Sequence, residues 1–79
     1  MAIYKYSRYL EQSQNEAFDA THPPGAAAPF DGIYRCLGCG LEAASSQGQP
    51  LPPQNHHRHH ELEGAIRWQL IVFMDYRKK

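Results

Sequence analysis

The sequence of 79 residues contains only two cysteines and one tryptophan, and its formal net charge is zero. Two cysteines exclude a framework of several disulfides, which is typical of small secreted domains. No apolar run is long enough to cross a membrane, and the first ten residues are too polar for a signal peptide. Balanced charge gives no overall field toward a polyanion or a membrane surface. We therefore expect a cytoplasmic protein without membrane contact, whose partner is chosen by local features.

Large apolar side chains are also scarce, and they concentrate in two stretches, 33–41 and 66–73. A chain this short buries a smaller fraction of its surface than a larger one does, so its core alone supplies little stability. Small domains of this size often add a metal or a disulfide. We expect one domain over residues 1–79, in which a bound metal supplements a thin core.

The residues best suited to hold a metal are Cys36 and Cys39, in the run Cys-Leu-Gly-Cys-Gly, and the histidine cluster that follows at 56–60. Two thiolates at this spacing with imidazoles one loop later form the ligand set that tetrahedral zinc prefers in structural sites. The alternative is a redox pair, but such pairs lie at the start of a helix, and no helical pattern follows Cys39. We predict one zinc ion per chain.

Which histidines complete the site is less constrained, because four of them lie within five residues. We favour His56 and His59, while the pairs His57 with His60 and His57 with His59 have compatible spacings. A nearby carboxylate, Glu61 or Glu63, would then orient one imidazole through its second ring nitrogen. The remaining histidine, His22, precedes a proline pair and is expected at the surface.

The pattern of apolar and turn residues predicts a small, mostly-β fold. Residues 33–36 and 41–44 read as a hairpin around the cysteine turn, with Gly38 and Gly40 suited to positive φ. Residues 64–75 read as the longest strand, whose apolar face should cover that hairpin. Proline-rich stretches interrupt the remainder, so residues 17–32 and 45–55 are predicted loops, the first anchored by Phe18 and Phe30. The apolar face consists of Ile66, Trp68, Leu70 and Val72.

The N-terminal segment interleaves three tyrosines, at positions 4, 6 and 9, with Lys5 and Arg8. Tyr6, Tyr9 and Leu10 fit one face of a short helix, whereas residues 3–8 alternate as in a strand, and we favour a short strand or irregular arm. Aromatic rings between cations can stack on single-stranded nucleic acid and neutralise it. The simpler expectation is that the tyrosines pack against their own domain.

Three runs of the sequence, 32–42, 50–57 and 64–70, resemble small bacterial zinc-ribbon proteins of unassigned role, of the kind called protein L. The resemblance covers the C-terminal half to two-thirds of the chain. It implies a ribbon over 32–75 preceded by an arm and loop over 1–31, with a knuckle-bearing hairpin, a second ligand pair and a completing strand. Such ribbons usually carry a second cysteine pair, so here histidines would stand in. The resemblance implies no biochemical activity.

For function, we expect a non-enzymatic interaction module that displays a surface to a protein or nucleic-acid partner. Four protein ligands would close the zinc sphere and leave no position for a reactive water. A metal-handling or metal-sensing protein that uses the histidine cluster is the alternative. A small zinc enzyme with three protein ligands is less favoured, because so short a chain hardly encloses a catalytic pocket.

Overall fold

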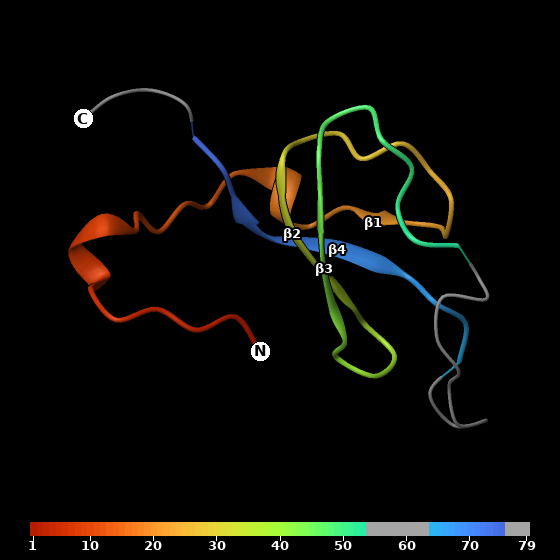
Figure 1. The fold of residues 1–79 in the computed structure, drawn as a ribbon, viewed down its shortest axis with the longest axis horizontal. Helices are drawn as coiled ribbons and strands as arrows, with labels where there is room; N and C mark the ends of the chain where they lie inside the picture. Colours follow the sequence, from red (N-terminus) through yellow and green to blue (C-terminus); the bar gives the residue numbers. More distant parts are fainter. Residues whose placement is uncertain (54–63, 76–79) are drawn as a thin grey trace.

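The protein is described from a computed structural model that covers residues 1–53 and 64–75; the segments 54–63 and 76–79 lie outside the description. Four strands form one antiparallel sheet in the order β1-β4-β2-β3 (Figure 1). They are β1 (Thr21–His22), β2 (Gly32–Cys36), β3 (Glu42–Ser45) and β4 (Trp68–Phe73). The prediction of a small, mostly-β protein is confirmed, and the described residues contain no α-helix.

The hairpin around the cysteines is the part of the sheet that local sequence specifies best. Strand β2 pairs with β3 from Gly32 opposite Ser45 to Arg35 opposite Glu42, and only the turn between them separates the two strands. The sequence suggests that β4 covers this hairpin, but in the structure it does not. It lies beside β2 in the same sheet, with Cys36 opposite Trp68, because its backbone groups satisfy those of β2.

A bulge in β4 changes which of its residues face the core. Tyr34 pairs with Leu70, whereas the preceding Ile33 pairs with Val72, so β4 contains one extra, unpaired residue at this point. The extra residue moves Val72 to the face of Ile33, opposite to that of Tyr34 and Leu70. The predicted apolar face therefore holds for Trp68 and Leu70 and is wrong for Val72.

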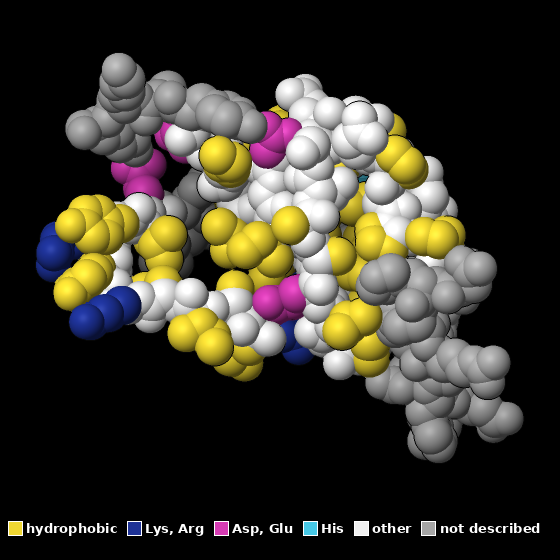
Figure 2. Space-filling view, viewed as in Figure 1, with side chains coloured by type: hydrophobic (Ala, Val, Ile, Leu, Met, Phe, Trp, Pro, Cys, Tyr) yellow, Lys and Arg dark blue, Asp and Glu magenta, His cyan; other side chains and the backbone are white. Residues whose placement is uncertain are grey.

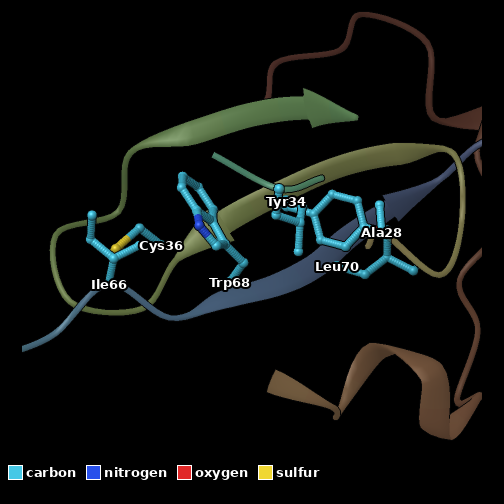
Figure 3. Packing of buried hydrophobic residues seen from close by; sticks show 7 residues of the cluster. Ala28, Tyr34, Cys36, Ile66, Trp68 and Leu70 are labelled. Carbon is cyan, nitrogen blue, oxygen red and sulfur yellow. The ribbon is translucent and has the colours of Figure 1, made fainter. Parts of the chain in front are cut away.

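The core lies on one face of the sheet and is small. Its buried members come from β2, β4 and the loops that cover them: Ala28, Tyr34, Cys36, Leu51, Ile66, Trp68 and Leu70 (Figure 3). Phe18 and Phe30 pack against this cluster, which confirms their predicted role as anchors. The Phe30 ring also meets Phe73 edge to face, with centroids 5.4 Å apart.

The segment before β2 is more ordered than the sequence predicts. Short 3-10 turns occupy Ser7–Tyr9 (η1) and Glu16–Phe18 (η2), and β1 joins the sheet through Thr21 opposite Gln69. The Gln69 amide fixes η2 to the sheet, because its Nε2 donates to the Phe18 carbonyl at 2.6 Å. Before residue 16 the described chain forms no strand and is irregular apart from η1, which agrees with the irregular arm and not with the short strand. Within the described ranges, no helix has the length and apolar character needed to cross a bilayer.

Candidate metal centre

The cysteine turn closes the β2–β3 hairpin and is held by three backbone hydrogen bonds. The amide of Cys36 donates to the Leu41 carbonyl at 2.8 Å, and the amide of Gly40 donates back to the Cys36 carbonyl at 2.7 Å. The third bond fixes the turn to the chain before β4, because the Leu37 amide donates to the Arg67 carbonyl at 2.9 Å. Both thiols therefore stand on a short, well-anchored loop.

The glycines of this turn differ in their use. Gly40 has a φ of +83°, a conformation that a side chain disfavours, and a Cβ there would lie 2.9 Å from an Arg35 guanidinium nitrogen. Gly38 does not have a positive φ, so of the two glycines suited to this conformation only Gly40 adopts it. One left-handed residue is enough to turn the chain back into β3.

The two thiols have contrasting surroundings. Cys36 is fully buried beside Ile66 and Trp68, as Figure 3 shows, whereas Cys39 is exposed. Cys36 thus contributes to the core whether or not it binds a metal, and Cys39 has no such packing role. Two soft donors on one tight turn fit half of a tetrahedral zinc site.

The segment that carries the histidine cluster leaves and rejoins the described structure near Cys36. Before it, the indole Nε1 of Trp68 donates to the Pro52 carbonyl at 3.2 Å, and Trp68 is the partner of Cys36 in the sheet. After it, Ile66 is buried in the same cluster as Cys36. His56 and His59, our predicted ligands, and the alternatives His57 and His60 lie outside the described residues. Among the residues that are described, no three potential ligands gather in one place.

His22 is half-buried and is not the surface residue that its sequence context predicts. This residue forms part of β1 opposite Trp68, its ring meets that of Tyr34 at a centroid distance of 6.2 Å, and its Nε2 is buried. No hydrogen-bond partner of that nitrogen occurs in the described part of the chain. A lone histidine before two prolines gave no local signal of burial, because only pairing with β4 brings it inward.

Two arginines, Arg35 and Arg67, share the face of the sheet that is opposite to the core. Arg35 is directly across from Gln69, and Arg67 precedes Gln69 by two residues, so strand alternation directs both the same way. Glu42 stands opposite Arg35 on the other side, and its carboxylate accepts from the Ala2 amide at 2.8 Å. A carboxylate therefore lies next to this pair of cations, on the β3 side of Arg35.

The tyrosines of the N-terminal arm do not pack on the domain, contrary to the simpler expectation. Tyr4 is 63% exposed and Tyr9 is 73% exposed, and η1 contains no buried residue. Figure 2 shows hydrophobic and basic side chains together at the outer end of the arm, which Figure 1 shows beside the sheet and separated from it.

Comparison with known proteins finds one informative relative. The chain is 54% identical to "Protein L" of Escherichia coli over 79 aligned positions, which span 95% of this chain and 90% of the relative. No protein-family model matches the chain. No solved structure matches it either.

Proposed function

This chain belongs to the same family as protein L of Escherichia coli, whose name states no activity, so we propose a function from the residues themselves. The protein is a non-enzymatic interaction module, a zinc ribbon in which one zinc ion is held by Cys36, Cys39 and two histidines of the cluster at 56–60. The ion joins the cysteine turn to the segment before β4. The sheet so stabilised presents a surface to a protein or nucleic-acid partner.

The observation that carries this proposal is the convergence of both ends of the histidine segment on Cys36. His56 follows Pro53 by three residues, so the chain carries it at most about 11 Å from there. His59 precedes Gly64 by five residues, a reach of about 18 Å. These chain lengths, together with the anchoring of Pro52 to Trp68 and the burial of Ile66 beside Cys36, support an approach of both favoured ligands to the cysteine turn.

The burial of Cys36 gives the metal a structural role. A thiolate fixed inside the core links zinc directly to Trp68 and Ile66, so metal binding and core formation occur together. Two cysteines and two histidines fill a tetrahedral sphere, which leaves zinc no water to activate. This ligand count supports binding over catalysis.

Cobalt substitution tests the ligand set. We expect a tetrahedral cobalt spectrum with thiolate charge-transfer bands, unchanged when a small ligand such as a hydroxamate is added. Cys39→Ser should abolish the thiolate bands of that cysteine while removing no core side chain, since Cys39 is exposed. A spectrum that responds to the small ligand while the fold persists would show an open position and favour a zinc enzyme.

Single alanine variants of His56, His57, His59 and His60 identify the other ligands. The proposal requires that two of the four variants lose zinc and that the other two keep it, with His56 and His59 as the favoured pair. Zinc content of each purified variant is the measurement. Loss in none of the four, or in all of them, contradicts a site of two cysteines and two histidines.

One observation supports a second candidate, a metal-handling protein. Cys39 is exposed, and an exposed thiolate ligand is open to attack by an incoming acceptor. Transfer of zinc to a competing chelator should then be fast and first order in the chelator concentration. A slow rate that is independent of the chelator would favour the purely structural role.

A further inference from the structure

The arm over residues 1–10 exposes apolar and aromatic side chains that its own domain leaves uncovered. The exposed fractions are 63% for Tyr4, 43% for Tyr6 and 73% for Tyr9. Three tyrosines in one short segment would normally pack against the core of their own domain, but the exposure of these rings shows that they do not. Bends of the backbone shape the segment instead, since the Tyr9 amide donates to the Tyr6 carbonyl at 3.1 Å and the Leu10 amide to the Ser7 carbonyl at 3.0 Å.

Both cations of the arm lie on the central ring, that of Tyr6. The ammonium of Lys5 is 5.1 Å from its centroid and the guanidinium of Arg8 is 4.4 Å from it. Arg8 also lies 4.8 Å from the Tyr9 centroid and donates to the Tyr9 hydroxyl at 3.3 Å. Tyr6 and Tyr9 stand edge to face, 5.8 Å apart. The contacts give the arm a defined arrangement in which Tyr6 positions the cations and the more exposed Tyr9 ring lies beside Arg8, while the exposed Tyr4 precedes Lys5 in the sequence.

We propose that this arm binds single-stranded nucleic acid, with Tyr4 and Tyr9 stacking on bases and Lys5 and Arg8 contacting phosphates. Residues 1–10 contain these two basic side chains and no acidic one, so the arm complements a polyanion although the whole chain is neutral. Arginine and lysine beside exposed rings match the alternation of charged phosphate and flat base.

Two other partners use less of what the arm offers. An acidic peptide would satisfy the cations, but it has no need of the exposed rings of Tyr4 and Tyr9. A duplex presents phosphates, but its base faces are covered by neighbouring base pairs, so the tyrosine rings could not stack on them. Unpaired bases use both features. This inference names the partner of the proposed interaction module, on which it rests, but it does not depend on zinc.

The small number of cations predicts how binding responds to salt. For a single strand the slope of log affinity against log salt is about −0.7 per neutralised phosphate, so two contacts give about −1.4, or about a sevenfold loss between 50 and 200 mM salt. Lys5→Gln combined with Arg8→Gln should bring the slope near zero. A steeper slope in the native protein that survives this double substitution would place the phosphate contacts outside the arm.

The test is fluorescence anisotropy with labelled twelve-residue oligonucleotides, oligo(rA) and oligo(dT), added to the full chain. We expect saturable binding of at least one strand, and binding at least tenfold weaker for the matching duplex. Tyr4→Leu with Tyr9→Leu should weaken binding at least tenfold, because leucine keeps the apolar surface and removes the ring. Tyr4→Phe with Tyr9→Phe is the matched control and should retain binding within about threefold, since stacking needs only the ring.

Several results would overturn the inference: no saturable binding to either strand, equal binding by the leucine variant, or equal binding of a strand whose bases have been removed. A glutamate-rich peptide that displaces the strand and binds the leucine variant unchanged would favour an acidic protein partner. Zinc content and amide NMR dispersion are measured on the same samples. A folded, zinc-containing protein that binds no strand refutes this inference alone, whereas loss of zinc or fold refutes the proposed zinc module separately.

Discussion

Tyr34 combines a buried ring with a polar end that is satisfied locally. Its hydroxyl donates to the Phe30 carbonyl at 2.7 Å and accepts from the Phe30 amide at 3.2 Å. These two bonds hold the loop before β2 against the core. Burial raises the pKa of Tyr34 above its ordinary value of 10.0, the bond to the Phe30 backbone lowers it, and nearby Asp31 adds to the increase.

This raised pKa predicts alkaline instability. The phenol remains neutral in the folded state at pH values where it ionises in the unfolded chain, so its contribution is complete below pH 10.0 and is lost as pH rises through the higher folded pKa. Urea unfolding from about pH 9 to about pH 11 measures the slope. Tyr34→Phe should flatten it while lowering stability at neutral pH, because the Phe30 groups lose their partner. An equal slope in the variant would contradict the assignment to Tyr34.

Trp68 is the largest fully buried side chain. Trp68→Ala should lower the free energy of unfolding by about 3–5 kcal/mol, because it leaves a cavity in the core on one face of the sheet. Urea unfolding followed by circular dichroism is the measurement. The control is Trp68→Phe, which keeps an aromatic ring, loses the bond to Pro52 and should cost less. Native tryptophan emission at the wavelength of the free amino acid would contradict this burial.

At the scale of the element, the bulge in β4 depends on a glycine in the neighbouring strand. A Cβ at Gly32 would lie 2.1 Å from the Val72 carbonyl oxygen and 3.0 Å from a Leu70 methyl. The backbone of β4 therefore approaches β2 where only a hydrogen fits. Gly32 also lies at the end of the β2–β4 pairing, opposite Phe73.

Gly32→Ala should destabilise the fold by about 1–3 kcal/mol, as overpacking against a backbone atom does. It should also speed amide exchange at the Phe73 end of β4. The control is Gly48→Ala, whose Cβ would meet no atom within 4 Å, so that its cost comes from a φ of +83° and not from a clash. Unchanged exchange in the Gly32 variant would show that the strands can separate there freely.

The sequence specified the elements whose signals are local. The hairpin followed from β-type residues on either side of a glycine-containing turn, and β4 followed from alternation between Trp68 and Leu70. Strand β1 has two residues and forms by pairing with the edge of β4, so no local sequence pattern predicts it. The bulge arises where β4 approaches Gly32 of β2, which shifts the register, and the inward position of His22 follows from β1. For the candidate metal centre, spacing predicts Cys36 and Cys39 as ligands, but four clustered histidines provide no comparable means of choice.

At the scale of the whole molecule, the described chain consists of a sheet and an N-terminal arm beside it. The described residues extend 43 × 26 × 19 Å, and Figure 1 shows that the arm accounts for part of this length, on the β2 and η2 side of the sheet. The Glu42 carboxylate meets the N-terminal ammonium at 3.3 Å, so the arm returns to the sheet at its start. In the described part of the chain, seven residues are buried in the core and none of these is charged. A thin core of this kind is the physical reason to expect that a metal completes the fold.

The most direct test of the account is zinc content measured together with an amide NMR spectrum before and after chelation. Protein purified without a histidine tag should contain one zinc per chain and give dispersed amide signals. A strong chelator should collapse that dispersion, and added zinc should restore it, because metal binding free energy here becomes folding free energy. A metal-free protein with a fully dispersed spectrum, or chelation that removes zinc and leaves the spectrum unchanged, would contradict zinc as the organiser of this fold.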